Sequence, residues 1–239
     1  RRSSDLDHDQ ELSGNRLTLN IDSTIRGMDS RSVVGIEAID LDFVRDRGFR
    51  RQVAQVPGDA VDPFDPQPGV YGQRELRGSS PTDMNSLAVF AGNALQLTDR
   101  LSVVSGLRHE SLDLSRLNFN AEGEQESSGF DRDYQWWSWR LGAVYNFADG
   151  FVGYGQYSNA KDPVNSNIFL VNNNQNFDLT TAKQWELGIK GSWLDGRAET
   201  TLAWFNIERD DIFERFSLDS VTNVGGRTSS GVEVSTALM

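Results

Sequence analysis

The segment "KQWELGIKGSWLDGRAETTLAWF", residues 183–205, alternates between apolar and polar residues on both sides of a central Asp-Gly pair. In its first half, one parity runs from Trp185 to Trp193 and is mostly apolar, while the other parity contains Glu186 and Lys190. A period of two residues is typical of a β-strand whose two faces meet different surroundings. The segment therefore predicts a hairpin of two amphipathic strands, whose apolar face meets either a protein core or lipid.

The central Asp195-Gly196 pair fixes the register of this hairpin, because Asp-Gly favours the positive φ values of a two-residue type I′ turn. Closing the chain there brings apolar residues opposite apolar ones and polar residues opposite polar ones, as cross-strand pairing requires. The predicted pairs are Trp193–Ala198, Ile189–Leu202, Leu187–Trp204, Ser192–Glu199 and Lys190–Thr201. The same reasoning at Asp149-Gly150 predicts the pairs Phe147–Val152 and Tyr145–Tyr154.

Strand length favours lipid over a protein core. Alternation persists from residue 183 to residue 194, whereas strands of soluble proteins usually run for about 5–6 residues. Twelve residues span about 40 Å, and a tilt of about 45° leaves a rise of about 28 Å, close to the hydrocarbon thickness of a bilayer. Glu186, Lys190 and Glu199 would be costly in a core but not in a watery lumen. A soluble antiparallel sheet packed on a core is the alternative.

The connections between the predicted strands alternate between tight turns and long loops. The sequence predicts about nine strands, at residues 15–27, 31–45, 84–97, 100–115, 132–147, 150–159, 183–194, 197–209 and 228–238. The tight turns are "MDS" (28–30), "TDR" (98–100) and the two Asp-Gly pairs, and the long loops are 46–83, 116–131, 160–182 and 210–227. Transmembrane barrels have this asymmetry, with short periplasmic turns and long extracellular loops. We therefore predict an all-β, antiparallel up-and-down meander that forms part of a transmembrane β-barrel.

Composition excludes several other classes of protein. The formal charge is −12 and the pI is about 4.6, which argues against a nucleic-acid-binding protein. The chain has no cysteine and only two histidines, so neither disulfides nor a thiolate or histidine-rich metal site is expected. No run of 18 apolar residues is present, and a membrane-spanning helix is therefore not expected.

Motifs in the last two thirds of the chain resemble the barrel strands of TonB-dependent outer-membrane receptors, especially the siderophore-receptor branch. The family pattern P-E-x-A-x-x-Y-E-x-G-x-K, a turn, and x-L-x-x-x-F-x-I-x-x-x-x-I is similar to residues 177–212, through Ala182, Trp185, Glu186, Gly188, Lys190, Phe205, Ile207 and Ile212. The sequences "LQLTDRLSVVSGLRHE" (95–110), "GFVGYGQYSNAKDP" (150–163) and "NVGGRTSSGVEVSTAL" (223–238) resemble other strands of the family. His109 stands where the family usually has tyrosine, and "FDL" (177–179) replaces the usual L-x-P-E.

This resemblance implies a receptor in the outer membrane of a Gram-negative bacterium that imports a ferric siderophore and is not an enzyme. Transport would be energised by an inner-membrane complex through TonB, which acts on a plug domain inside a barrel of about 22 strands. We expect residues 1–239 to be a fragment of the barrel domain, without the plug domain and the final strands. The expected partners are outer-membrane lipid, the receptor's own plug and TonB, and the chain itself is expected to bind no cofactor. The alternatives are a passive porin-like barrel and a soluble ligand-binding β-sheet.

Candidate ligand contacts lie in the predicted loops, because the family binds ligands at its plug and outer loops. Aromatic rings could stack on a metal–siderophore complex and amides could hydrogen-bond it, although each loop could equally be an ordinary solvated one. The candidates are Phe64, Tyr71, Phe130, Phe169 and Asn173. Asp59, Asp62 and Asp65 miss the EF-hand spacing for calcium. Arg108, Arg140 and Lys190 are expected to line water and contact the plug, and His109 is expected on a strand rather than in a catalytic triad.

Overall fold

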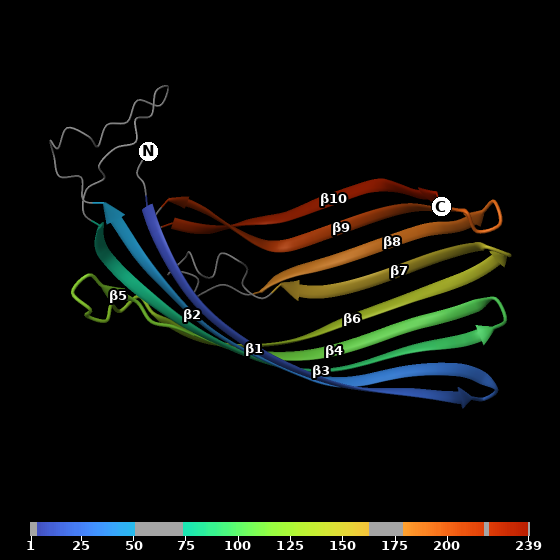
Figure 1. Ribbon diagram of the computed structural model, residues 1–239, viewed down its shortest axis with the longest axis horizontal. Helices are drawn as coiled ribbons and strands as arrows, with labels where there is room; N and C mark the ends of the chain where they lie inside the picture. The colour runs from blue at the N-terminus through green and yellow to red at the C-terminus, as the bar shows by residue number, and fades with distance from the viewer. Residues whose placement is uncertain (1–3, 51–73, 163–178, 218–219, 239) are drawn as a thin grey trace, which may run out of the picture.

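The computed structural model describes residues 4–50, 74–162, 179–217 and 220–238, and these form a single antiparallel sheet (Figure 1). Its strands are β1 (Ser4–Ile25), β2 (Met28–Arg50), β3 (Arg74–Thr98), β4 (Leu101–Arg116), β5 (Phe119–Asn120), β6 (Phe130–Ala148), β7 (Phe151–Asp162), β8 (Thr180–Trp193), β9 (Ala198–Ser217) and β10 (Ser220–Leu238). Within these ranges no helix is long and apolar enough to cross a membrane.

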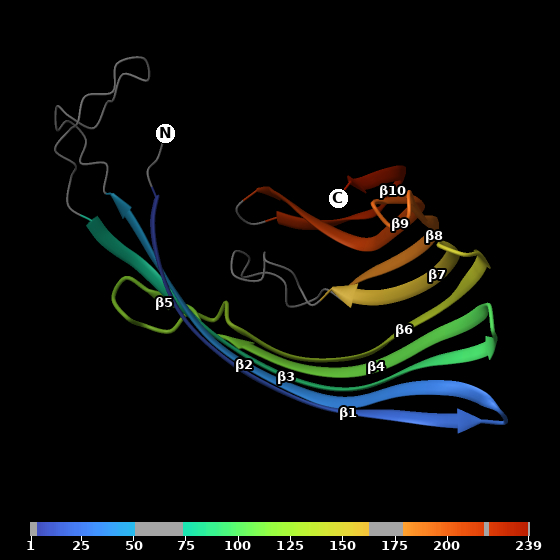
Figure 2. The ribbon, with the colours of Figure 1, turned by 45° about the vertical axis from the view of Figure 1, so that its right-hand side comes forward.

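Neighbouring strands of the sheet follow one another along the chain. The order is β1-β2-β3-β4-β6-β7-β8-β9-β10, and the two-residue β5 pairs with β3 outside this path. The nine long strands confirm the predicted antiparallel meander. The sheet curls into an open trough, and β1 and β10 form its two edges (Figure 2).

The tight turns all lie at one end of the trough, which is the right-hand end in Figure 1. One of them differs from the prediction. The first turn is Arg26-Gly27, with φ of +52° and +84°, and Ile25 pairs with Met28. The predicted turn at residues 28–30 is therefore wrong, because the glycine that supplies a left-handed φ precedes those residues, which belong to β2.

The hairpin of β8 and β9 has the predicted register. Trp193 pairs with Ala198, Ile189 with Leu202 and Leu187 with Trp204, and the two polar pairs are also observed. The turn closes through Arg197, whose N–H donates to the carbonyl oxygen of Leu194 at 3.2 Å. Asp195 and Gly196 have φ of +56° and +85°, as a type I′ turn requires.

The hairpin of β6 and β7 is displaced by one residue from its predicted register. Tyr145 pairs with Gly153 rather than Tyr154, and Asn146 pairs with Val152. A shift between Asn146 and Ala148 leaves Phe147 outside the ladder, as in a β-bulge. Of the Asp149-Gly150 pair only Gly150 has positive φ, at +75°, so the turn is not type I′ and the bulge absorbs the extra residue.

Several strands extend well beyond their predicted ends at the opposite end of the trough. β1 begins at Ser4, β9 continues to Ser217, and β10 begins at Ser220. The predicted long loop at 210–227 is therefore wrong, because most of it belongs to this ladder. Register shifts near Gly225, whose φ is +88°, allow the ladder to continue through an irregular segment.

Candidate functional site

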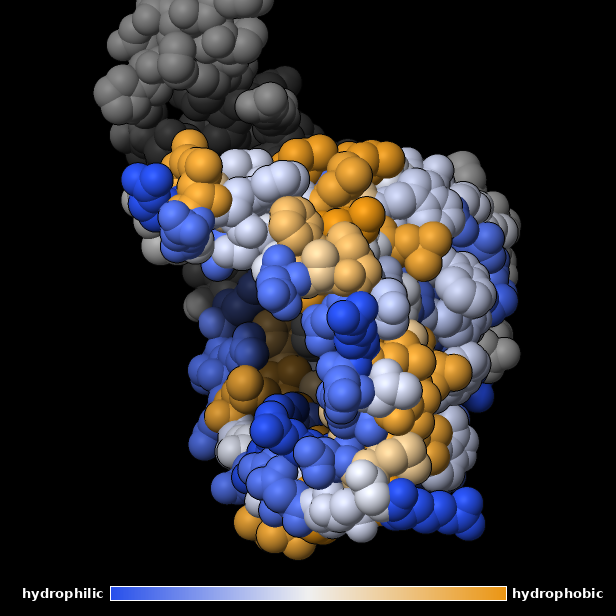
Figure 3. Space-filling model, turned by 90° about the vertical axis from the view of Figure 1, so that its right-hand side faces the viewer, coloured by the Kyte–Doolittle hydropathy of each residue, from blue (hydrophilic) through white to orange (hydrophobic). Residues whose placement is uncertain are grey.

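The two faces of the sheet carry different kinds of side chain. Large apolar side chains are exposed on the outward, convex face, although exposed residues of this size are normally scattered in soluble proteins. They include Leu17, Leu19, Ile21, Val34, Ile36, Leu87, Val89, Leu107, Trp137, Trp139, Leu141, Trp185, Leu187, Ile189, Leu202, Trp204, Val232 and Val234. Figure 3 looks along the strands from the tight turns and shows the hollow enclosed by the opposite, concave face.

Aromatic rings border this apolar band at both ends. Towards the long connections, Tyr157 lies between Trp139 and Trp185, with ring centroids 5.0 and 4.6 Å away. Near the tight turns, Phe151 lies 4.8 Å from Trp193 and 6.0 Å from Phe147. Aromatic girdles around an apolar band of about 25 Å are typical of transmembrane β-barrels, so the convex face is the one suited to lipid.

Carboxylates line the convex face beyond the girdle that lies towards the long connections. The ladder aligns them in two adjacent rows across β1–β6, and all of them are exposed. One row contains Asp40, Asp113 and Asp133. The other row contains Glu11, Asp42, Asp83 and Asp131. A hydrogen bond with Asp83, together with desolvation and the charge of Asp40, raises the pKa of Asp42. The lipid-facing band is thus bounded by an acidic zone on these strands.

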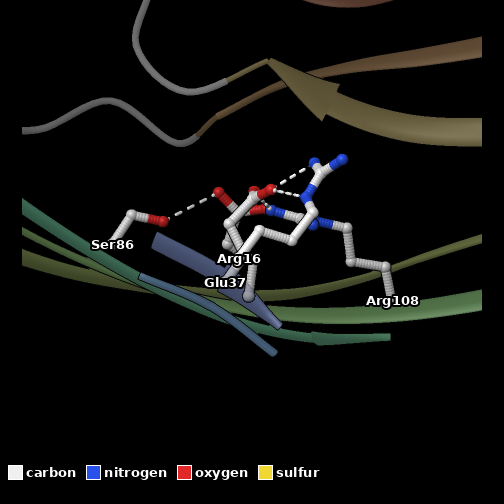
Figure 4. A network of polar contacts seen from close by, with 5 residues as sticks. Arg16, Glu37, Ser86 and Arg108 are labelled. Carbon is white, nitrogen blue, oxygen red and sulfur yellow. Dashed lines mark hydrogen bonds and ion pairs between the residues drawn. The ribbon is translucent and has the colours of Figure 1, made fainter. Parts of the chain in front are cut away.

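The concave face carries an ionic network where β1–β4 meet (Figure 4). Arg16 pairs with Glu37, and Nη2 of Arg108 lies 2.8 Å from Oε1 of the same carboxylate. Nε of Arg108 also donates to Oε2 of Glu110 at 2.7 Å, and the Ser86 hydroxyl donates to Oε1 of Glu110 at 3.0 Å. Four charges from three strands, β1, β2 and β4, are therefore mutually neutralised on the inner wall.

Phe90 supports this network from β3. Its ring lies over Gly35, where a Cβ would come within 2.3 Å of Cζ. The guanidinium carbons of Arg16 and Arg108 lie 5.7 and 5.9 Å from the ring centroid, within the range of cation–π attraction. Glycine at position 35 thus lets one aromatic ring hold both guanidinium groups.

A depression of about 500 Å³ lies beside the network on the concave face. Two glycines form its floor, because Gly92 pairs with Gly106 and Gly106 pairs with Arg140. Arg16, Arg108 and Arg140 all line it, together with Phe90. This inner-wall depression brings three guanidinium groups to one place.

A second polar cluster occupies the concave face of β7 and β8 and is centred on Glu186. This carboxylate accepts hydrogen bonds from the Tyr154 hydroxyl at 2.7 Å and from the amides of Gln156 and Gln184, both at 3.1 Å. The Lys190 Nζ lies 5.3 Å from the ring centroid of Tyr154. The Glu186 carboxylate is therefore hydrogen-bonded by neutral donors, whereas the Glu37 carboxylate binds two guanidinium groups.

Apolar side chains gather on the concave face towards the long connections. Leu112, Trp136 and Leu179 form one buried cluster, with Met84 and Tyr134 packed against it. Leu179, directly before β8, thus reaches β4 and β6 across the inner face. A neighbouring cluster joins Leu114 and Phe130.

The sequence matches the family model described as "TonB dependent receptor-like, beta-barrel" over residues 1–238. The chain belongs to this family of TonB-dependent receptor barrels. The family consists of transport receptors of the Gram-negative outer membrane, which in general have a plug domain and interact with TonB. The lipid suggested by the apolar band is therefore the outer membrane.

Relatives of known name share part of their length with this chain. It is 33% identical over 78 residues to the ferripyoverdine receptor of Pseudomonas aeruginosa, and the aligned segment covers 33% of this chain and 9% of the relative. It is 25% identical over 172 residues to the ferric-pyoverdine BN7/BN8 receptor of Pseudomonas putida, covering 69% of the chain and 20% of the relative. The chain thus spans at most about a fifth of these relatives.

A solved structure supports the fold. The closed form of the ferric-catecholate import receptor Fiu from Escherichia coli K12 superposes with a TM-score of 0.82 at 18% identity. The match covers 98% of this chain and 36% of Fiu. The long strands are thus arranged as in part of a receptor barrel.

The structure places only some of the predicted site residues. Phe64, Tyr71, Phe169 and Asn173 lie outside the described residues, as do Asp59, Asp62 and Asp65. Phe130 begins β6 and is 9% exposed against Leu114, so its ring packs at a strand end. The ligand-contact role of all five candidates remains a prediction.

Three predicted inner residues and His109 are described. Arg108, Arg140 and Lys190 lie on the concave face, as the alternation indicated. His109 lies on the convex face, with its ring 4.6 Å from that of Trp137. Across the described ranges, no group of three or more His, Cys, Asp or Glu side chains is arranged to hold a metal ion.

Sequence reasoning missed Arg16, Glu37, Glu110 and Phe90 as members of one site. Parity gave a clear signal only for Arg16, which lies on the polar face of the predicted strand 15–27. Glu37 shares its face of the predicted strand 31–45 with Val33 and Ile39. The displaced first turn concealed their pairing. A turn at residues 28–30 would pair 27 with 31 and hence 16 with 42, whereas Arg16 lies opposite Glu37.

Proposed function

We propose that the protein containing this chain is an outer-membrane receptor that imports a ferric siderophore, with energy delivered through TonB. The observation that carries the proposal is the match of residues 1–238 to the TonB-dependent receptor barrel. Two curated relatives whose names specify ferric pyoverdines support the class of cargo. The same match favours this proposal over a soluble binding module.

The division of the sheet into two faces supports the same role. An apolar band between aromatic girdles suits a wall in lipid, and the ionic network around Glu37 suits a lumen that contains water or polar protein groups. We propose that residues 1–239 are one part of the barrel domain, and that a plug domain and further strands complete the receptor. TonB would then act through the plug, and binding and transport would involve no catalysis by this chain.

Uptake of radioactive iron tests this function. Cells that express the full-length gene should accumulate iron supplied as a ferric siderophore, whereas a deletion strain should lose uptake of at least one siderophore. The panel should include a pyoverdine, a ferric tris-catecholate, ferric citrate and a ferric tris-hydroxamate. Unchanged uptake of every member in the deletion strain would refute the proposal.

Energy dependence distinguishes this receptor from a passive porin-like barrel. A protonophore or deletion of tonB should abolish uptake while leaving binding of the ferric siderophore to the cell surface intact. Uptake that continues at the same rate in either condition would favour passive diffusion. Reintroducing the full-length gene on a plasmid is the matched control.

A further inference from the structure

Glycines on β3 and β4 form the floor of the inner-wall depression beside Arg140. Val33, Gly92, Gly106 and Arg140 occupy successive positions across β2, β3, β4 and β6. A Cβ on Gly106 would lie 3.1 Å from both Cγ and Nε of Arg140. The missing side chain thus allows Arg140 to lie flat against the wall and leaves room above it.

The charges around the depression are arranged with cations towards the lumen. The side chain of Arg16 is 60% exposed, while Glu37 is 12% exposed and Glu110 is 16% exposed. The carboxylates therefore lie beneath the guanidinium groups that they bind. Arg16 and Arg108 each retain N–H groups beyond those used by Glu37 and Glu110, because a guanidinium has five donors.

Arg140 contributes an exposed guanidinium to the same depression. Among the residues that the structure describes, its guanidinium has no ion pair or hydrogen bond, in contrast to that of Arg108. A planar guanidinium binds two oxygens of an anionic group side by side. The depression is therefore complementary to a ligand that carries carboxylate or other anionic oxygens.

We propose that this depression binds an anionic part of the ferric chelate as the chelate crosses the barrel. Arg140 would be its principal contact, and Arg16 and Arg108 would add positive potential. The inference rests on the proposed function and deepens it, because it assigns the cargo to anionic chelates rather than neutral ones. A volume of about 500 Å³ lies within the range of small-molecule sites.

The test uses cells that express the full-length receptor with Arg140→Gln, which removes the charge and keeps most of the volume. Uptake of a ferric tris-catecholate and of ferric citrate, both anionic, is compared with uptake of a neutral ferric tris-hydroxamate. The variant should lower the maximal uptake rate of the anionic chelate that the wild type transports by roughly tenfold. Surface binding in energy-depleted cells should stay unchanged, and Arg140→Lys should restore part of the rate.

Two further variants keep the test informative if Arg140→Gln fails to fold. Ser138→Glu places a carboxylate in the depression, because Ser138 also lines it, and it should lower uptake of the anionic chelate to a similar degree. Lys190→Gln removes an exposed inner-face cation outside the depression and should leave uptake unchanged. Heat-modifiable migration of the receptor on gels checks that each barrel is folded.

Three results would overturn the assignment. The first is an uptake rate equal to that of the wild type in both Arg140→Gln and Ser138→Glu. The second is a wild-type receptor that transports only the neutral chelate. The third is a loss of uptake rate in the variants that is equal for anionic and neutral chelates. The last result would indicate that Arg140 holds a protein segment inside the barrel. Absence of surface binding of every chelate to wild-type cells would instead identify a failure of the proposed function.

Discussion

Adjacent residues on β8 meet opposite surroundings, although only the backbone separates them. Leu187 and Ile189 lie exposed on the convex face, whereas Glu186 and Lys190 lie on the concave face. In a soluble protein the exposed face would be the polar one. On β8 the environment of each face therefore determines the side chain, because the convex face meets lipid and the concave face meets the lumen.

The largest expected effect comes from placing a charge on the convex face. Ile189→Arg should destabilise the full-length receptor in phospholipid vesicles by about 3 kcal/mol, since a cation near the bilayer midplane costs this much in a barrel. Urea unfolding followed by tryptophan fluorescence measures the change. Lys190→Arg is the matched control on the next residue, and it should leave the free energy of unfolding unchanged. Equal effects of the two substitutions would show that the convex face does not meet lipid.

A smaller effect is expected from removing the shared carboxylate of the concave face. Glu37→Gln leaves Arg16 and Arg108 without their common anion, and we expect the free energy of unfolding to fall by about 2 kcal/mol. The same urea titration measures it. Glu199→Gln, at an exposed position on the concave face of β9, should change it little. A stable Glu37→Gln barrel would mean that the lumen solvates both guanidinium groups.

Substitution at Gly35 tests how the ring of Phe90 is accommodated. An added Cβ would lie 2.3 Å from Cζ of Phe90 and 2.8 Å from the carbonyl oxygen of Leu17. Gly35→Ala should therefore cost about 1.5 kcal/mol through overpacking, as judged by the urea midpoint. At Gly14, also on the concave face, the nearest atoms to an added Cβ are 3.9 Å away. Gly14→Ala should be tolerated, and a loss of the same size there would argue against a specific clash.

The smallest effect is expected at a water-exposed ion pair on the convex face. Lys183 and Asp210 are separated by 3.7 Å, and their side chains are 45% and 51% exposed. Lys183→Gln should change the free energy of unfolding by less than about 0.5 kcal/mol, because solvent weakens such a pair. Measurements at low and high salt check this expectation. A loss as large as that of Glu37→Gln would place Lys183 in a less solvated environment than its exposure indicates.

The membrane-spanning part of the fold could be predicted because two signals agree there. Strict alternation identified the faces of β8 and β9, and Asp195-Gly196 fixed their register. At β6 and β7 the turn signal was equally clear, but the bulge at Phe147 moved the ladder by one residue. A bulge depends on the local twist and packing of two strands, and neither can be read from an Asp-Gly pair.

Prediction was weaker where both faces of a strand lie outside the membrane. Residues 4–14 belong to β1, yet "SDLDHDQELSG" lacks a continuous apolar face because no lipid selects one. The ionic network was missed for another reason. Its four charges come from three strands, and the misplaced first turn shifts the register of β1 and β2 by five residues, which separates Arg16 from Glu37. A site assembled from several strands therefore requires every intervening register to be correct.

The one-residue separation of the two faces also bears on how the barrel is assembled. If the hairpin of β8 and β9 paired as a unit with β7 one residue out of register, Glu186, Lys190 and Glu199 would turn towards the acyl chains. Each misplaced charge would carry a penalty that rises with depth in the bilayer. The bilayer thus favours the native register over the slipped one, in addition to the matched side-chain pairs of the ladder.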